Sequence, residues 1–319
     1  MKKLTVKLAV ILGILLLVSI AFGCAAPAPK TVAFPDENFE AAIRDALDKP
    51  EGDITPAELA GLTVLSAREL RIIDLSGIEY CTNLSELDLD SNRISDISPL
   101  ASLTSLTWLQ LNSNQVDDIS PLASLTSLEI LILYRNQISD ISPLASLNNL
   151  SELNLDTNRI SDISPLASLT SLSVIELDHN QISDISPLAS LTSLALLYLD
   201  NNQISDISPL ASLTSLEVLH LRANQISDLS PLSSLTSLRT LKIGANQIGD
   251  ISPLASLTNL HELQVAENQI SDISPLVENS GLSEEDRIGI TDNNLDLSEG
   301  SEDMENIRIL EERGVDVEY

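Results

Sequence analysis

The chain has 319 residues and a formal net charge of −30, and only 3% of its residues are aromatic. So acidic a chain repels nucleic acid and anionic lipid headgroups, which makes both poor partners. Globular cores commonly use bulky aromatic side chains to fill space, so a core of leucine and isoleucine indicates one small packing unit that is stacked many times.

Residues 1–23 have the pattern of an export signal. Lys2, Lys3 and Lys7 accompany an apolar run over residues 8–22, and this run is shorter than the ~20 residues that a membrane-spanning helix needs. We therefore predict a signal peptide over residues 1–23.

A candidate lipid attachment site follows directly. The segment Ala21-Phe22-Gly23-Cys24 resembles a bacterial lipobox, and acyl chains on Cys24 would anchor the protein, because each buried CH₂ contributes ~0.8 kcal/mol. Residues 24–33 would then form an extended tether. Ordinary cleavage with free secretion is the alternative. Either way we expect an exported protein of the cell envelope or its surroundings, with membrane contact only through Cys24.

Residues 34–61 are expected to form a helical cap. Apolar residues at helical spacing occur at Phe39, Ala42, Ile43, Ala46 and Leu47. The segment Thr55-Pro56-Ala57-Glu58 is a capping box with proline at the first helical position, so a second short helix is predicted there. Such helices would cover one open end of a repeat stack.

Asparagine recurs at a constant spacing within the frame Leu-x-x-Leu-x-Leu-x-x-Asn-x-Ile-x-Asp-Ile-x-Pro-Leu-x-x-Leu. The asparagines are Asn92, Asn114, Asn136, Asn158, Asn180, Asn202, Asn224, Asn246 and Asn268. A fixed period of this length predicts a solenoid in which equivalent residues of successive coils stack. We place the repeats over residues 62–281. In the degenerate first coil Cys81 takes a core leucine position and is expected to be buried.

The coil around Asn136 shows how the frame should fold. Leu131-Ile132-Leu133 alternates inward and outward and predicts a short strand. Asn136 follows at a turn, where its amide can bind backbone groups, so the asparagines should form a buried ladder. Ser142-Pro143 predicts a helical turn with the serine as N-cap.

Residues 282–319 are expected to form an irregular last coil and a second cap. Ile288, Ile290, Asn293 and Leu295 repeat part of the frame. A helix is predicted to start at Ser301, because acidic residues follow it in the first turn, and residues 315–319 could add a final strand.

The frame resembles the 22-residue class of leucine-rich repeats in bacterial internalin-like proteins, over residues 62–295, and the segment from Phe34-Pro35-Asp36 resembles the helical cap of that family. The resemblance implies an α/β solenoid: a curved right-handed coil with a concave parallel sheet, short helical turns on the convex side, a helical N-terminal cap and a helix–strand C-terminal cap. It is specific for fold but weak for function. We expect the chain to lack the immunoglobulin-like domain that follows the repeats in internalins, so adhesion to host cells is an analogy only.

The outward-facing strand positions lie six, four and two residues before each repeat asparagine, and they vary between coils while the remaining frame barely changes. Unconstrained drift would give this pattern too, but apolar residues that face water, with aromatic and basic residues beside them, favour a binding surface. The candidate partner-binding residues are Trp108, Ile130, Ile132, Tyr134, Val174, Leu196, Tyr198, Val218, His220 and Arg222. Acids are expected around them at Asp88, Asp90, Asp156, Asp178 and Asp200. We predict a partly apolar, partly basic ligand, namely a protein or peptide.

Three functions stay open. The first is an extracellular protein-binding module for adhesion, recognition or envelope assembly. The second is recognition of cell-wall or other polysaccharide, which planar aromatics beside Asp, Asn and Arg could serve. The third is a passive structural surface protein, which would not need Trp108 and its apolar neighbours in water.

A second column of aspartates runs through nine coils: Asp96, Asp118, Asp140, Asp162, Asp184, Asp206, Asp228, Asp250 and Asp272. Neighbouring carboxylates ~5 Å apart repel each other, so we expect backbone N–H groups to offset the repulsion by ~1.5–3 kcal/mol each. Calcium is the alternative, but it is disfavoured because one Asp per coil supplies few of the six to eight oxygen ligands that calcium takes.

Catalysis is not expected. His179, His220 and His261 fall at different repeat positions about two coils apart, too far for a metal cluster. No phosphate loop or nucleophile elbow occurs in the sequence. The carboxylates are expected on an open, solvated surface with ordinary pKa values. The sequence thus indicates a binding protein without a cofactor.

Overall fold

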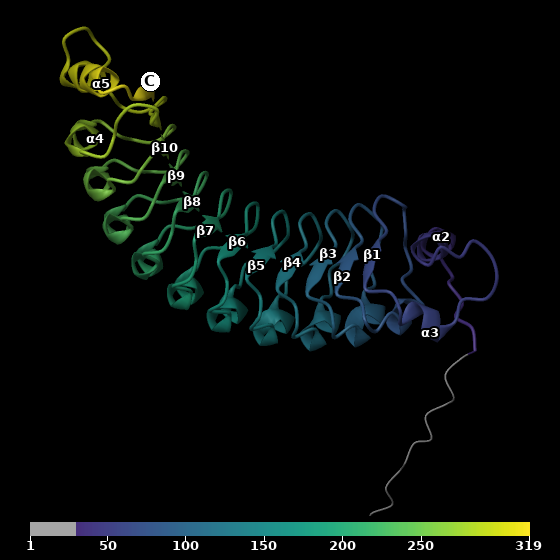
Figure 1. Ribbon diagram of the computed structural model, residues 1–319. Coiled ribbons are helices and arrows are strands. Elements are labelled where there is room, and N and C mark those ends of the chain that lie inside the picture. Colours follow the sequence, from purple (N-terminus) through teal and green to yellow (C-terminus); the bar gives the residue numbers. More distant parts are fainter. Residues whose placement is uncertain (1–29) are drawn as a thin grey trace, which may run out of the picture. The chain divides into compact units, whose positions relative to one another are not determined.

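One parallel sheet of twelve strands runs along the repeats, and the strands follow one another in chain order (Figure 1). Register partners occupy equivalent positions of successive coils, so that Trp108 in one strand lies beside Ile130 in the next. The strands are β1 Val64–Ser66, β2 Glu86–Asp88, β3 Trp108–Gln110, β4 Ile130–Ile132, β5 Glu152–Asn154, β6 Val174–Glu176, β7 Leu196–Tyr198, β8 Val218–His220, β9 Thr240–Lys242, β10 Glu262–Gln264, β11 Arg287–Gly289 and β12 Asp316–Glu318.

The computed structural model describes residues 30–319. The predicted signal peptide, Cys24 and most of the predicted tether lie outside the described residues. Within residues 30–319 no helix combines the length and the apolar character needed to cross a bilayer.

Each coil returns through a short helix on the side opposite its strand. Figure 1 shows these helices along the outer side of the curved stack and the strands along its inner side. The helices are 3₁₀ turns: η1 Ile78–Tyr80, η2 Ser98–Ser102, η3 Ser120–Ser124, η4 Ser142–Ser146, η5 Ser164–Ser168, η6 Ser186–Ser190, η7 Ser208–Ser212, η8 Ser230–Ser234 and η9 Ser252–Ser256. An α-helix, α4 Ser274–Glu278, takes their place in the coil that follows η9. The predicted leucine-rich-repeat solenoid is therefore confirmed.

The predicted role of Ser142 is wrong. This serine is the first helical residue of η4, and the preceding cap position, Ile141, makes no side-chain cap bond. The carboxylate of Asp140 instead accepts a 2.8 Å hydrogen bond from the backbone N–H of Ser142. Asp140 therefore does the capping, because its side chain can reach the N–H two residues ahead.

The core of each coil consists of inward-pointing leucine and isoleucine side chains. In the coil of Asn136 seven of them are at most 1% exposed, namely Leu128, Leu131, Leu133, Ile138, Ile141, Leu144 and Leu147. Each buried side chain contributes ~1.5–3 kcal/mol, while fixing the backbone costs ~1–2 kcal/mol per residue over the whole coil. A single coil is therefore not stable alone, and stability depends on contacts between coils.

The repeat asparagines link successive coils. The Nδ2 of Asn136 donates to the carbonyl oxygens of Leu111 and Leu133 at 2.9 and 3.0 Å, and its Oδ1 accepts from the N–H of Val116 at 3.0 Å. The same bonds recur along the stack, so one side chain per coil satisfies backbone groups of two coils. The residue before each of these asparagines has a positive φ of 52–58°, which closes the turn.

Helices close both ends of the stack. Helix α2 (Glu37–Ala46) is capped by Asp36, whose Oδ1 accepts from the N–H of Phe39. Its Oδ2 accepts from the N–H of Ile73 at 2.7 Å and so ties this cap to the first coil. Helix α3 (Pro56–Leu59) starts with the predicted capping box.

At the other end α5 (Glu302–Glu312) is capped by Ser301 and contacts α4. Strand β12 pairs with β11. The predicted caps are thus confirmed as helical at one end and as helix plus strand at the other.

Candidate functional site

The concave face of the stack carries two apolar stretches. We define this face as the strand residues of β1–β11 whose side chains point away from the core, together with the loops that flank these strands. Parallel register places Trp108 beside Ile130. It also places Leu196 between Val174 and Val218. The sequence suggested that these side chains face water, but all five are half-buried. Strands ~4.8 Å apart bring neighbouring side chains into contact, so each covers part of the next.

A hollow opens at the first stretch. It has a volume of about 300 Å³ and is lined by Glu86, Thr107, Trp108, Glu129 and Ile130. The lining residues come from three successive strands, β2, β3 and β4, and from the residues directly before β3 and β4. The side chain of Trp108 thus shares the wall of this hollow with two glutamates, a threonine and an isoleucine.

The acids at the centre of the face form a column of their own. The Oδ1 of Asp156 accepts from the N–H of Asp178 at 2.7 Å, and the Oδ1 of Asp178 accepts from the N–H of Asp200 at 2.6 Å. The Oδ1 of Asp200 in turn accepts from the N–H of Arg222 at 2.6 Å. This acid column, Asp156, Asp178 and Asp200, therefore binds the backbone of the next coil at every step.

The predicted open, solvated setting with ordinary pKa values is wrong for this column. Burial, together with the charges of neighbouring acids, raises the pKa of Asp156 and of Asp178 to about 7. Burial also raises the pKa of Asp200, although its N–H donor at Arg222 and the charges of His220 and Arg222 oppose the rise. The sequence marks this column by an aspartate two residues before the repeat asparagine in three consecutive coils. It does not show that these aspartates are buried, because their burial depends on the neighbouring side chains.

Glu176 extends the acidic region. Its Oε2 accepts from the Nδ2 of Asn154 at 2.7 Å, and burial beside Glu152 raises its pKa. Asp88 and Asp90 differ, because both are buried and paired with Arg68, at 3.3 and 2.8 Å.

The remaining predicted partner-binding residues lie in two groups. Tyr198 packs edge-on against His220 with ring centroids 4.7 Å apart, and burial lowers the pKa of His220. The guanidinium of Arg135 lies 5.8 Å from the centroid of the Tyr134 ring. Ile132 is half-buried in β4. Arg222 pairs with Glu267 at 3.0 Å.

The second aspartate column belongs to the scaffold. Each of its nine carboxylates accepts a 2.8 Å bond from the N–H of the serine two residues ahead. These bonds lower the pKa of Asp96, Asp118, Asp140, Asp184 and Asp206. Over residues 30–319 no three His, Cys, Asp or Glu side chains are grouped as metal ligands.

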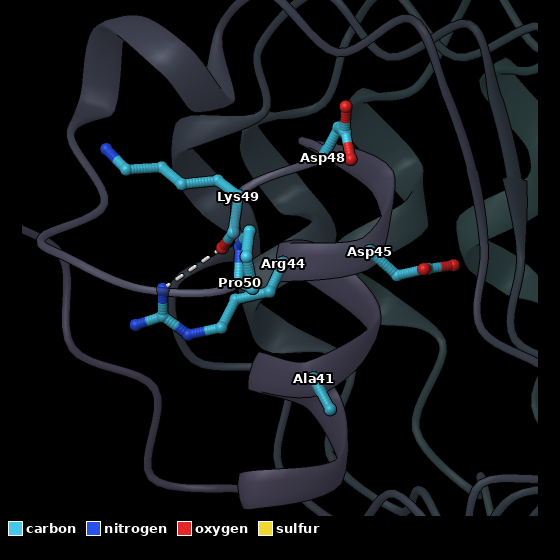
Figure 2. Close-up of a pocket in the computed structure, with 6 residues that line it drawn as sticks. All are labelled: Ala41, Arg44, Asp45, Asp48, Lys49 and Pro50. Carbon is cyan, nitrogen blue, oxygen red and sulfur yellow. Dashed lines mark hydrogen bonds between the residues drawn. The ribbon is translucent and has the colours of Figure 1, made fainter.

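A second hollow lies on the N-terminal cap. It measures about 360 Å³ and is lined by Ala41, Arg44, Asp45, Asp48, Lys49 and Pro50. Figure 2 shows Arg44 directed at the backbone of Lys49, to which it donates a hydrogen bond. Arg44 also donates to the carboxylate of Glu40 and to the carbonyl of Gly52. These bonds hold the cap loop together. Lys49, the other cation of the lining, pairs with Glu58 at 2.6 Å, so both described cations of this hollow are engaged.

The groups that could support catalysis are scattered. His179 and His220 lie in different coils from His261, which pairs with Asp286 at 2.8 Å. Cys81 is fully buried, and burial raises the pKa of its thiol to about 12. Such a thiol stays protonated and is a poor nucleophile.

The comparisons with known proteins agree with this architecture. The family model described as leucine-rich repeats in two copies matches residues 61–102 and 104–146, and then, in overlapping pairs of coils, residues 126–278. Among curated proteins no significant match was found.

Solved structures give closer relatives. An internalin (inlF) from Listeria monocytogenes is 36% identical, with a TM-score of 0.73, over 92% of this chain and 98% of that chain. Internalin C2 of the same species is 43% identical, with a TM-score of 0.64, over 70% of this chain and 98% of that chain. The plant peptide hormone receptor RGFR1, solved in complex with RGF2, is 25% identical, with a TM-score of 0.60, over 68% of this chain and 37% of that chain.

The matched repeats cover most of the described residues, and the first of these internalins aligns over nearly its whole length. The chain therefore belongs to the leucine-rich-repeat family, as an internalin-like bacterial member of it.

Proposed function

We propose that the protein acts outside the cell as a binding module, and that its concave face holds a protein or peptide ligand. The observation that carries this proposal is a combination on one face. Half-buried apolar and aromatic side chains lie there together with acids, such as Asp156, Asp178 and Glu129, that form no salt bridge among the described residues. Trp and Tyr on such a face are the residue types that dominate binding energy at interfaces. The ligand should be partly apolar and partly basic.

The relatives support a binding role. The plant receptor of similar fold was solved in complex with RGF2, and repeat solenoids use their concave surfaces for binding. Among the described residues the histidines are scattered and the Cys81 thiol is buried, so we propose binding without chemistry.

The test is a double substitution on the concave face. Trp108→Ala with Tyr134→Ala should weaken binding of a captured protein ligand by about a hundredfold or more, since each truncated aromatic hot spot costs ~2 kcal/mol. Gln115→Ala with Gln225→Ala is the matched control, because both glutamines are exposed and lie just beyond the strands. If both double variants bind alike, the concave face is not the site. The same variants on a glycan array would detect polysaccharide recognition instead.

We also propose that residues 1–23 direct export and that Cys24 carries the lipid anchor, with residues 24–33 as tether. The support is the lysine-led apolar run and the small residues before Cys24. Cys24→Ser should move the protein from the membrane fraction to the medium or soluble envelope fraction, and mass spectrometry of the mature N-terminus would detect the acyl chains. An unmodified Cys24 would contradict the lipid anchor and favour a freely secreted protein.

A further inference from the structure

We propose that the hollow beside Trp108 receives a basic side chain of the protein ligand, with a lysine or arginine lying over the indole ring between Glu86 and Glu129. The inference rests on the proposed function of the concave face and adds the chemistry of one subsite.

The register of the sheet builds this subsite. Glu86 and Ile130 are the strand partners of Trp108 on either side, and Glu129 directly precedes Ile130. The two carboxylates and the indole therefore border one hollow of about 300 Å³. That volume is at the bottom of the range of ~300–1,000 Å³ found for small-molecule pockets, which suits a single long side chain.

The charges around the hollow are unbalanced, and the repeat itself supplies the comparison. Glu262 occupies the same coil position as Glu86 and pairs with Lys242 at 3.1 Å. Glu217 occupies the same coil position as Glu129 and lies 3.6 Å from Arg239. Within residues 30–319, Glu86 and Glu129 have no such ion pair. At these two coil positions the glutamate therefore pairs with a basic side chain at the far end of the face, but not beside Trp108.

Two basic side chains of the neighbouring coils are engaged elsewhere. Arg68, one strand before Glu86, pairs with Asp88 and Asp90. Arg135, at the other edge of β4, lies over the ring of Tyr134 at 5.8 Å. No basic side chain of the described residues lines the hollow, so a cation there would be supplied by a ligand.

The lining suits such a cation. Tryptophan is the best aromatic partner for a cation that lies over its face, and hydrogen bonds from an ammonium or guanidinium group to carboxylates are stronger than those between neutral groups. Ile130 and the Thr107 methyl can cover the alkyl stem, which lysine and arginine bury readily. An acidic side chain would be repelled by both glutamates.

Trp108 is the only tryptophan of the chain, so tryptophan fluorescence reports on this hollow alone. The probes are an acetylated and amidated Gly-Arg-Gly-Arg-Gly peptide and the same peptide with citrulline, which is isosteric but uncharged. We expect a saturable change in emission with the arginine peptide and about tenfold weaker binding of the citrulline peptide, because the loss of two weak ion pairs has this effect.

The matched protein variants locate the site. Glu86→Gln with Glu129→Gln should weaken the arginine peptide about tenfold. Glu262→Gln with Glu217→Gln changes the net charge equally but lies far along the face, and it should alter the affinity less than about twofold. Glu86, Glu129 and Glu217 are exposed, and the side chain of Glu262 is 38% exposed. Thermal unfolding should therefore verify that the variants fold alike.

Three results would overturn the inference: no emission change with the arginine peptide, equal binding of both peptides, or equal loss in both double variants. None of these would affect the wider proposal. A protein ligand that depends on Trp108 and Tyr134 but not on Glu86 and Glu129 would keep the concave face as the site and remove the basic subsite.

Discussion

The backbone N–H of Asp178 donates a 2.7 Å hydrogen bond to Oδ1 of Asp156, so two half-buried acids of successive coils lie side by side on the concave face. Burial opposes the ionisation of both, and the charges of neighbouring acids add to this effect. The protein therefore carries, in the middle of its proposed binding surface, two carboxyls with pKa values of about 7.

Stability should fall as the pH rises through neutrality. In the unfolded chain these aspartates ionise near the ordinary pKa of 3.8, whereas in the fold their pKa is about 7. The stabilisation from the protonated acids is therefore fully present below about pH 4 and is lost as the pH rises through about 7. Urea unfolding between these pH values should show a decreasing free energy of unfolding.

The matched variant for this effect is Asp156→Asn with Asp178→Asn. Asparagine keeps the oxygen that accepts the backbone N–H but cannot ionise, so the pH dependence between about 4 and 7 should flatten. An unchanged slope would show that other groups cause it. The capping aspartates act in the opposite direction, because their lowered pKa values make stability fall at still lower pH.

Removal of a ladder asparagine should be costly. Asn202 donates to the carbonyls of Leu177 and Leu199 and accepts from the N–H of Ile182. Asn202→Ala leaves these groups buried and unpaired, and we expect a loss of about 3 kcal/mol in the free energy of unfolding. The neighbouring exposed Gln203→Ala should change it by less than ~0.5 kcal/mol. Similar values for both would mean that water replaces the amide.

Thr157→Asn should stabilise the fold. Thr157 precedes a ladder asparagine and has a φ of 54°, which a β-branched residue tolerates poorly. Asparagine adopts this conformation more easily, so we expect a gain of about 1 kcal/mol in chemical unfolding. Asn201, at the same coil position with a φ of 56°, allows the reverse experiment. Asn201→Thr should destabilise by a similar amount, and a loss in both directions would contradict the explanation.

Asp140→Ala should weaken a single coil turn. It removes the acceptor of the Ser142 N–H, and the loss of a cap lowers the free energy of unfolding. Asp140→Asn keeps an acceptor oxygen and should lose less. Equal losses for Ala and Asn would indicate that the negative charge matters more than the hydrogen bond.

The fold followed from the sequence because its period is strict. One asparagine per coil at a constant spacing, with leucines at fixed offsets, defines strand, turn and core for each coil, so β3 to β10 could be placed in advance. The role of Ser142 does not follow from the sequence, because serine and aspartate are both good caps and the sequence does not show which side chain reaches the free N–H.

The site was predictable only in part. The position of Trp108 on the face follows from its offset to Asn114. The hollow beside it, and the burial of Asp156 and Asp178, depend on how side chains of adjacent coils cover each other. This burial depends on the side chains of two adjacent coils, so the sequence of one repeat alone does not predict it.

The hollow takes its walls from three consecutive coils, through Glu86, Trp108 and Ile130. Because each coil contacts only its neighbours, the addition or deletion of whole coils would leave the core pattern undisturbed. A coil inserted or deleted between β4 and the acid column would leave the hollow intact and change only its distance from that column. An insertion or deletion within β2–β4 would change the residues that line the hollow. The number of coils therefore sets the distance between the hollow and the acid column, while the scaffold of each coil stays the same.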